Sequence, residues 1–438
     1  SSALQELKLK FNSADTKFAG LEQGKEYLLS SAEDKSAIEN ALGISLPEVG
    51  ATEAVLDFTS LLPQLMTNKG ATVTSTIEVD VKANNRWASE DATVNRVYTL
   101  KCNKPEFSIV TNPGNFWCKE FSVDSCDIKT GDIETISQKI QYQYRKKGDE
   151  QWIDCDRLVQ FDDYPVDKQY QIRAVYREGI ETEPVDVVLE TPQQLPNSDM
   201  EEWYIEEKKK SGTWPSKDKT YYTFHPYAEG NASSSWWATN NDKAQGGTYA
   251  FGIWYEGCFA SCVSYTEDAH GGTKAALMYL SGCGDGYANT AGTYVGGAMV
   301  GSLFIGTYDS GIIQGHDFGS RPTSMSFWYK YKPYNSDAFK VVVSLKNGDR
   351  EIATGTYEPA ASSEENGEYG HATVDFNYTE PFEKATSICV QFLASNKTSL
   401  SQSDFDLGTT ITYPVIGDWT VHMGSILKID DISLAFDK

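Results

Sequence analysis

Short β-prone segments separated by clusters of Gly, Asn, Ser and Asp fill residues 195–438, and no long amphipathic helix interrupts them. Segments of this kind bury apolar surface only when several of them pair into sheets and the sheets pack together. The strand candidates are residues 275–280, 324–331, 339–345, 371–376, 387–393 and 426–436. We therefore predict that residues 194–438 fold as a β-sandwich of the jelly-roll type.

A smaller module precedes this region at residues 1–103. Ser31 opens a helix-capping signature and Gly43 stands where a helix would end, so we expect a short helix over residues 31–42. Residues 72–81 alternate with period two and are rich in β-branched side chains, which predicts a strand. Together these patterns predict a mixed α+β module, and they indicate no particular family.

Residues 104–193 contain alternating segments that are typical of antiparallel strands. The clearest are residues 141–145 and 170–176, and each is followed by a turn and a returning segment. Trp152 lies on one of the returns, in a pattern that predicts a buried side chain. We expect an immunoglobulin-like or fibronectin III-like β-sandwich here, so the whole chain is predicted to be mainly β.

The charge of the chain excludes several classes of ligand. Its 438 residues carry 62 Asp and Glu against 38 Lys and Arg, a formal net charge of −24. An acidic surface repels phosphate backbones and anionic lipids, so we expect neither nucleic-acid binding nor electrostatic membrane binding. No segment approaches the roughly 18–20 apolar residues of a transmembrane helix. A neutral ligand is favoured over a polyanionic one.

The cysteines leave the redox environment open. Eight cysteines without a C-x-x-C pair fit either one to four disulfides in an exported protein or buried free thiols. The chain starts at Ser1 without an apolar leader, which is expected if a signal peptide has been removed.

Several ordered segments in the C-terminal part resemble one family. They are Leu195-Pro-Asn-Ser-Asp-Met-Glu-Glu-Trp203, Trp237-Ala-Thr-Asn-Asn241, Gly301-Ser-Leu-Phe-Ile-Gly306, Gly315-His-Asp-Phe-Gly-Ser-Arg-Pro-Thr-Ser324, Phe327-Trp-Tyr-Lys-Tyr-Lys-Pro333 with Asp337, and Ile429-Asp-Asp-Ile-Ser-Leu434. Together they resemble the carbohydrate metabolism domain of exported Bacteroidetes proteins. The family more usually has Phe at the position of Met200.

The resemblance implies a fold, a location and a class of ligand. The fold would be an immunoglobulin-like domain followed by a jelly roll similar to glycan-binding modules and some glycoside hydrolases. The protein would be exported to the outer-membrane surface or periplasm, with a lipid anchor upstream of Ser1, and would serve polysaccharide utilisation. The resemblance implies carbohydrate as the partner but specifies no reaction.

Glycan sites combine flat aromatic rings, which cover the C–H face of a sugar, with polar groups that pair its hydroxyls. Trp236 and Trp237 with Asn240 offer that mixture beside a Ser-rich loop, and Trp254 with Glu256 offers it again. Adjacent residues of a strand face opposite sides, so we expect only one of the two adjacent tryptophans to reach a ligand. The alternative is that both anchor a loop on the sandwich.

A second candidate cluster follows the family-like segment. Arg321 and Asp337 could hold sugar hydroxyls through bidentate hydrogen bonds, and Tyr329 with Tyr331 lies on one face of a predicted strand. The alternative, which we favour for the charged residues, is an ion pair that joins two loop ends.

Acidic residues near both ends of the predicted jelly roll indicate a metal. Glu201 lies near its start and Asp431 in its last strand, and first and last strands of such folds often lie together. Hard oxygen ligands suit Ca²⁺, so we expect a structural calcium site there, with solvated carboxylates as the alternative.

Three hypotheses about function follow from these patterns. The first is a monomeric, non-catalytic surface protein that binds a polysaccharide or oligosaccharide through the jelly roll. The second is a glycoside hydrolase or polysaccharide lyase, which requires two carboxylates, or an acid with His or Tyr, in one pocket. The third is an adhesin that binds another protein through an exposed apolar patch. No residue is assigned a catalytic role.

Overall fold

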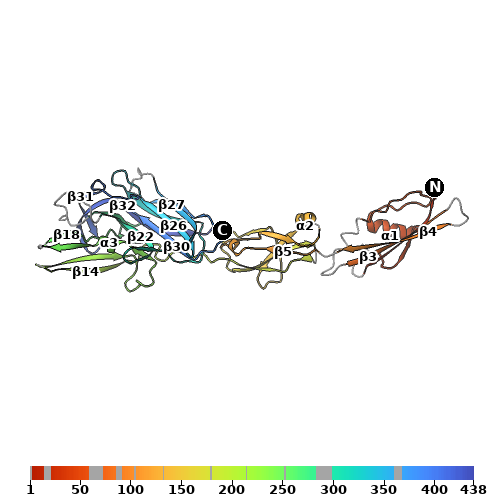
Figure 1. Cartoon of the computed structure of the whole chain (residues 1–438), viewed down its shortest axis with the longest axis horizontal. Helices are drawn as coiled ribbons and strands as arrows, with labels where there is room; N and C mark the ends of the chain where they lie inside the picture. The colour runs from red at the N-terminus through yellow and green to blue at the C-terminus, as the bar shows by residue number, and fades with distance from the viewer. Residues whose placement is uncertain are drawn as a thin grey trace. The chain divides into compact units, whose positions relative to one another are not determined.

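The computed structural model describes residues 2–13, 21–58, 73–84, 91–102, 105–131, 133–177, 180–213, 215–250, 253–282, 298–359 and 367–438. The chain is mainly β, as predicted. It divides into two compact units (Figure 1). Unit 1 comprises Ser1–Asn112, Ser122–Val159 and Gln169–Val188, and unit 2 comprises Pro113–Phe121, Gln160–Lys168 and Leu189–Lys438. Within the described residues, no helix has the length and apolar character needed to cross a membrane.

The N-terminal part of unit 1 is an antiparallel sheet covered by one helix. Its strand order is β2-β1-β3-β4, and the bounds are β1 Leu4–Ser13, β2 Glu26–Leu28, β3 Val73–Ala83 and β4 Ala92–Cys102. Helix α1 (Ala32–Leu42) has Ser31 as its N-cap, and Gly43 ends it in a left-handed conformation with φ 65°. The capping signals therefore predicted this helix correctly.

The rest of unit 1 contains a five-stranded sheet of order β12-β11-β8-β9, with β13 also paired to β11. Its strands are β8 Gln141–Lys146, β9 Ile153–Cys155, β11 Gln169–Arg177, β12 Ile180–Glu181 and β13 Val185–Val188. A separate pair of strands, β5 Phe107–Val110 and β7 Ser125–Ile128, and helix α2 (Ile133–Lys139) belong to the same part of the unit. Trp152 corrects one expectation. Its side chain is half-buried and lies under the guanidinium groups of Arg145 and Arg173, at 4.4 and 4.2 Å from the ring centroid.

Unit 2 is a β-sandwich whose chain passes repeatedly between two antiparallel sheets, as a jelly roll does. One sheet has the order β16-β22-β30-β26-β27-β29, with β23 and β24 added at its margin. Its bounds are β16 Trp237–Thr239, β22 Ser302–Tyr308, β23 Ile312–Gln314, β24 His316–Asp317, β26 Lys340–Asn347, β27 Arg350–Tyr357, β29 Asn377–Tyr378 and β30 Ser387–Leu393.

The facing sheet has the order β19-β20-β32-β25-β28, with β21 and β31 paired to β20 and β32. Its bounds are β19 Val263–Thr266, β20 Ala275–Ser281, β21 Met299–Val300, β25 Ser324–Lys332, β28 Gly370–Asp375, β31 Asp406–Tyr413 and β32 Gly417–Ala435. Apart from two hairpins, the remaining described elements are β6 Glu120–Ser122, β10 Leu158–Gln160, helix α3 Asn241–Ala244, and two 3₁₀ turns, Pro113–Asn115 and Gln402–Asp404. All six strands predicted for this region are present.

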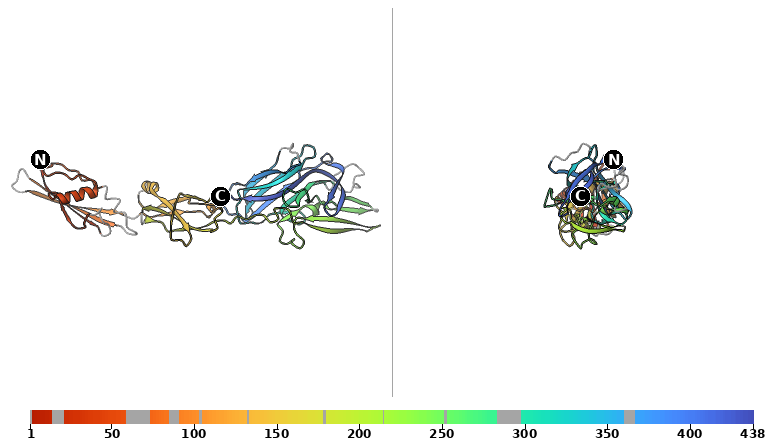
Figure 2. Two further views of the ribbon diagram at one scale, coloured as in Figure 1. Left: turned by 180° about the vertical axis from the view of Figure 1, so that it is seen from behind. Right: turned by 90° about the vertical axis from the view of Figure 1, so that its left-hand side faces the viewer.

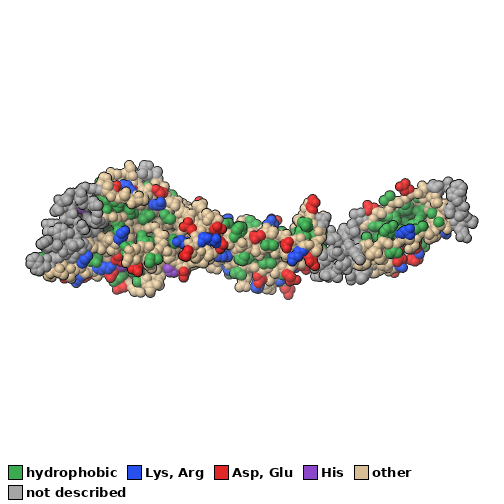
Figure 3. Space-filling model, viewed as in Figure 1, with side chains coloured by type: hydrophobic (Ala, Val, Ile, Leu, Met, Phe, Trp, Pro, Cys, Tyr) green, Lys and Arg blue, Asp and Glu red, His purple; other side chains and the backbone are tan. Residues whose placement is uncertain are grey.

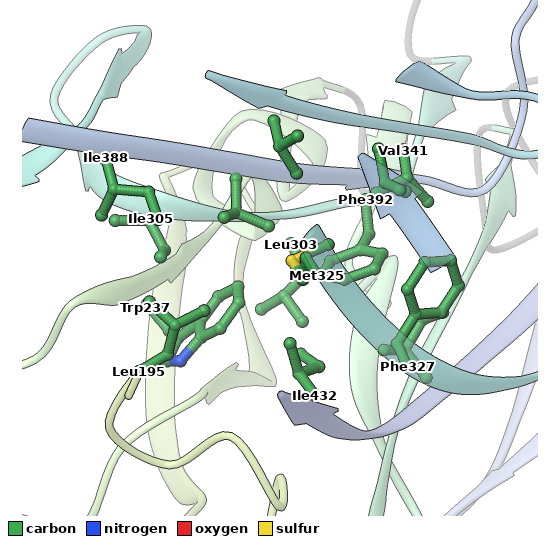
Figure 4. Packing of buried hydrophobic residues seen from close by; sticks show 14 of the residues in the cluster. Leu195, Trp237, Leu303, Ile305, Met325, Phe327, Val341, Ile388, Phe392 and Ile432 are labelled. Atoms are coloured by element: carbon green, nitrogen blue, oxygen red, sulfur yellow. The ribbon is translucent and has the colours of Figure 1, made fainter. Parts of the chain in front are cut away.

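The core of unit 2 lies between these sheets (Figure 4). Trp237 projects into it beside Leu195, and Phe327 and Phe392 pack edge to face with ring centroids 5.3 Å apart. Burial of aromatic side chains of this size supplies a large share of the hydrophobic stabilisation of a domain.

Two hairpins lie at the end of unit 2 that is opposite to the C-terminal residue (Figures 1 and 2). The first pairs β14 (Tyr204–Thr213) with β15 (Ser216–His225), and the second pairs β17 (Gly246–Ala250) with β18 (Ile253–Cys258). Phe224 of β15 packs in a second apolar cluster with Tyr279 and Tyr413, which fixes the first hairpin on the sandwich. Acidic and basic side chains are interspersed over the visible face of the unit (Figure 3).

Candidate functional site

A hollow of about 170 Å³ lies where β15, β16, α3 and β22 meet in unit 2. Aromatic rings line it from Tyr227, which follows β15, and from Tyr308, the last residue of β22. His225 and Asp242 add an imidazole and a carboxylate. The hollow therefore combines apolar surface with hydrogen-bonding groups of both polarities.

The local sequence explains how His225 is held. His225 is the last residue of β15, and Pro226 follows it, which lacks the N–H needed to continue the ladder. Across the hairpin, His225 Nε2 lies 2.9 Å from Glu206 Oε2. The imidazole also lies between two tyrosine rings, stacked on Tyr204 with centroids 5.9 Å apart and tilted against Tyr227 at 5.2 Å. Its orientation is thus fixed by a carboxylate and two rings.

Lys208 of β14 links the two carboxylates at this site. Its Nζ lies 3.3 Å from Glu206 Oε2 and 2.7 Å from Asp242 Oδ1. Burial alone would raise the pKa of Glu206, but the hydrogen bond from His225 and the charge of Lys208 outweigh it, and the pKa is lowered. Glu206 is therefore an ionised hydrogen-bond acceptor at neutral pH.

The pKa values of the two tyrosines that line the first hollow are raised, whereas that of Glu206 is lowered. Burial, reinforced by the negative charges of Glu206 and Asp242, raises the pKa of Tyr227. Burial and the charge of Asp242 likewise raise the pKa of Tyr308. Both phenols therefore remain protonated at neutral pH and can donate hydrogen bonds to a ligand.

A second hollow of about 190 Å³ adjoins the first. The lining residues that the two hollows share are Pro226, Tyr227, Ser235 and Trp237, and these residues form a common wall. Trp236 lines the second hollow, and its indole stacks on His316 with ring centroids 4.1 Å apart at an interplanar angle of 17°. Asn231 and Glu202 add an amide and a second carboxylate to this lining.

No family model matches the chain, and no curated protein matches it. Solved structures similar to it include carbohydrate-binding modules and glycoside hydrolases. The carbohydrate-binding module TmCBM61 in complex with beta-1,4-galactotriose is 12% identical over 46% of this chain and 88% of its own, with a TM-score of 0.22. A carbohydrate-binding module described for promiscuous specificity within the β-sandwich superfamily is 9% identical over 76% and 98%, with a TM-score of 0.23.

A third structure, a family 43 glycoside hydrolase acting as an arabinoxylan arabinofuranohydrolase in Bacillus subtilis, is 9% identical over 83% of this chain and 64% of its own, with a TM-score of 0.22. The family resemblance of residues 195–434 stays a prediction.

The structure separates the predicted tryptophan pair. Trp237 borders both hollows but is only 1% exposed. Its ring lies in the core and donates from Nε1 to the Pro196 carbonyl at 2.7 Å, so it presents no face to a sugar and its predicted glycan contact is corrected. Trp236 is half-buried at the second hollow. Asn240 is also corrected, because its buried amide bonds the backbone of Val300 and Ser302. The side chains of Trp254 and Glu256 lie outside the described residues.

Arg321 and Asp337 do not form the predicted pair. Arg321 is 1% exposed and pairs with Glu190, 131 residues earlier in the chain. The Asp337 carboxylate is also 1% exposed and accepts hydrogen bonds from Ser395 and Ser425, at 2.8 and 2.6 Å. Burial makes both unavailable to a ligand, so the predicted sugar contacts are corrected in favour of structural roles.

The predicted tyrosine face of β25 points into the sandwich. Tyr331 is 1% exposed in the core, and Tyr329 packs against that core, with its ring centroid 4.9 Å from that of Phe339. Neither is placed for a glycan, which corrects both assignments. Trp328 lies on the opposite face of the strand, where His270 stacks on it at 3.8 Å.

Glu201 and Asp431 do approach the same loop. Glu201 accepts hydrogen bonds from the backbone N–H groups of Thr273 and Lys274 at 2.6 and 2.8 Å. Asp431 Oδ2 lies 2.6 Å from His270 Nδ1. Within the described part of the chain, no group of three or more His, Cys, Asp or Glu side chains could hold a metal ion. Calcium here would need backbone carbonyls and water to complete its six to eight oxygen ligands.

The sequence prediction missed most of the residues that line the two hollows. His225, Tyr227, Asp242 and Tyr308 come from β15, the loop after it, α3 and β22, and they match no spacing motif. One sequence feature could have indicated these residues. In His225-Pro226-Tyr227, a histidine and a tyrosine flank a proline that ends a strand.

Proposed function

We propose that unit 2 binds a neutral oligosaccharide in the two adjoining hollows beside residues 226–236. The observation that carries the proposal is that Tyr227 and Tyr308, with His225 and Asp242, line one concave surface. Aromatic rings cover the apolar face of a sugar, while the phenols, imidazole and carboxylate pair its hydroxyls.

The size and charge of the site support this class of ligand. Each hollow is smaller than the roughly 300–1,000 Å³ of pockets that enclose a drug-sized molecule, so an extended ligand that occupies both fits better than a compact one. Glu202, Asp242 and a chain charge of −24 oppose the entry of sulfated or uronic sugars.

The electrostatics of the site favour binding over hydrolysis. A glycosidase needs a carboxylic acid whose pKa is raised so that it can donate a proton to the leaving oxygen. The pKa of Glu206 is instead lowered. Lys208 contacts both Glu206 and Asp242, which holds the two carboxylates as fixed hydrogen-bond acceptors.

Isothermal titration of the full chain against neutral plant and host polysaccharides and their oligosaccharides tests the proposal. Tyr227→Ala and Tyr308→Ala should each weaken binding of the best ligand by about tenfold or more, the loss expected for an aromatic anchor. Tyr164→Ala is the matched control, because Tyr164 is 46% exposed in the same unit and lines neither hollow. Absence of measurable binding to every glycan of the panel contradicts the proposed site. Equal affinities of the wild type and the three variants for the best ligand also contradict it.

We also propose that the protein acts outside the cytoplasm, where polysaccharides are encountered. The support is the resemblance of residues 301–324 and 429–434 to exported proteins. Immunodetection in fractions of the native cells tests this. Recovery from the cytoplasm alone contradicts it.

A further inference from the structure

Among the strands that the structure describes, β4 has one long unpaired edge and ends the N-terminal sheet. It is the last strand in the order β2-β1-β3-β4, and its inner edge pairs with β3 over eleven residues, from Ala83↔Ala92 to Val73↔Cys102. Within the described ranges, no strand pairs with its outer edge. A free edge of this length presents a row of backbone N–H and C=O groups that another strand can join.

The side chains of β4 do not protect this edge. Residues 92–99 are exposed on both faces of the strand, with Val94 46%, Val97 53% and Tyr98 55% exposed. Edge strands of soluble proteins are commonly blocked by Pro, by a bulge or by several lysines. Strand β4 contains no Pro, its one lysine is Lys101 next to its end, and its pairing with β3 has no register shift. Valine, tyrosine and threonine here are instead strong strand formers.

We propose that β4 is a docking edge for a second copy of this chain, paired antiparallel across a two-fold axis at Val97. Val97 is the central residue of Ala92–Cys102, so this register pairs the two strands over their full length. An interface of this kind is isologous, because the same surface is used by both copies. It joins the two four-stranded sheets into one continuous sheet.

The register makes the edge complementary to itself. Val97 meets Val97, Val94 faces Leu100, and Arg96 faces Tyr98 of the other copy, where its guanidinium can lie over the ring. No like charges meet among these pairs. A register centred one residue earlier would bring two Arg96 guanidiniums together, which disfavours it.

The same register also extends the core of each copy. Val94, Arg96, Tyr98 and Leu100 lie opposite Val81, Val79, Ile77 and Ser75 of β3, respectively. Ile77 and Val79 belong to the buried cluster that α1 covers, so the four β4 residues share the core-facing side of the sheet. Tyr98 and Val94 extend beyond that cluster and remain exposed in one copy. Pairing across the axis places Leu100 of the other copy beside Val94 and the Arg96 guanidinium of the other copy beside Tyr98 on that face. The sequence alone favoured a monomer, and the unprotected edge is the reason to expect a dimer.

Sedimentation velocity of the full chain over a range of concentrations tests the proposal. We expect a reversible species of twice the 48.6 kDa monomer mass that is lost in Val97→Lys, because two ammonium groups then meet at the axis. Val188→Lys is the matched control, since Val188 is 58% exposed on β13 of the same unit. This control variant should dimerise like the wild type.

A charge-swap experiment separates loss of pairing from loss of folding. Val97→Lys and Val97→Glu should each be monomeric alone and should form a mixed dimer when combined, because opposite charges then meet at the axis. A wild type that is monomeric at every concentration overturns the proposal. So does a Val97→Lys variant that dimerises normally, or a mixture of the two variants that stays monomeric.

Discussion

Arg321 donates from Nε to Oε1 of Glu190 at 2.8 Å, and the two side chains are 0% and 6% exposed. The guanidinium also lies 3.6 Å from the centroid of the Trp117 ring and donates to the carbonyl of Pro381 at 2.8 Å. Lys384 Nζ lies 2.8 Å from the same Glu190 oxygen. This buried ion pair connects the strand-entry segment before β25 with residue 190, at the start of the main segment of unit 2.

Removal of the arginine should destabilise unit 2 strongly. Arg321→Ala leaves the Glu190 carboxylate buried beside Lys384 alone, and breaking a buried pair in this way costs about 3–5 kcal/mol. Urea unfolding followed by tryptophan fluorescence measures the change. Glycan affinity of the folded fraction should be unchanged, because Arg321 lines neither hollow. A variant of wild-type stability that has lost binding would show that Arg321 contacts the ligand.

Trp236 and Trp237 should respond differently to the same substitution. Trp237→Ala opens a cavity in the core and should lower the unfolding free energy by about 3–5 kcal/mol. Trp236→Ala removes the ring at the second hollow and should weaken oligosaccharide binding by about tenfold, with a smaller loss of stability. Thermal unfolding and titration calorimetry on both variants measure the two effects. A loss of binding in Trp237→Ala at wild-type stability, together with a loss of stability in Trp236→Ala at wild-type affinity, would contradict the site.

The stability contributed by Glu206 should depend on pH. Its pKa is lowered in the folded state, so the contribution is present above the unfolded pKa of about 4.3 and is lost as pH falls through the folded value. Glu206→Gln should therefore have a lower Tm than the wild type at pH 7, and the difference should shrink below about pH 4. Glu207→Gln, on an exposed side chain of the same strand, is the control. A Tm difference that is constant from pH 7 to pH 3 would contradict the role of Glu206.

We propose that Ca²⁺ binds beside Glu201 and Asp431, because both carboxylates reach the loop at residues 270–274. A Cβ at Gly271 would lie 2.5 Å from Asp431 Oδ2, and one at Gly272 would lie 2.2 Å from Glu201 Oε1, so both carboxylates lie against adjacent glycines. A chelator should lower the Tm, and added Ca²⁺ should restore it. Asp431→Asn should abolish that response. A Tm that is insensitive to chelator would leave the carboxylates as hydrogen-bond acceptors for the loop.

Local patterns predicted the elements well where one physical signal was dominant. Ser31 and Gly43 bounded α1 because capping chemistry acts within a few residues. The alternating sequence of residues 324–331 predicted a strand. It did not predict which face of that strand points into the core. Tyr329 and Tyr331 on one face and Trp328 on the other are all aromatic, so hydrophobicity alone could not decide which side faces the core.

The site was harder to predict because it depends on contacts between distant segments. Tyr227 and Tyr308 line one hollow although they lie far apart in the sequence, and no spacing rule connects them. The β14–β15 hairpin was missed because Glu206-Glu207-Lys208-Lys209-Lys210 has no apolar alternation. Its pairing with β15 nevertheless places Glu206 beside His225. Tertiary pairing, not local propensity, assembles the hollows.

The wall that the two hollows share has a consequence for how affinity depends on ligand length. Because Tyr227 and Ser235 border both hollows, a glycan chain held in one presents its next sugars to the other at a high effective concentration. The second contact is then intramolecular and avoids most of the entropic cost of a separate binding event. Affinity should rise steeply once the chain is long enough to cross the wall, and then level off as further sugars extend into solvent.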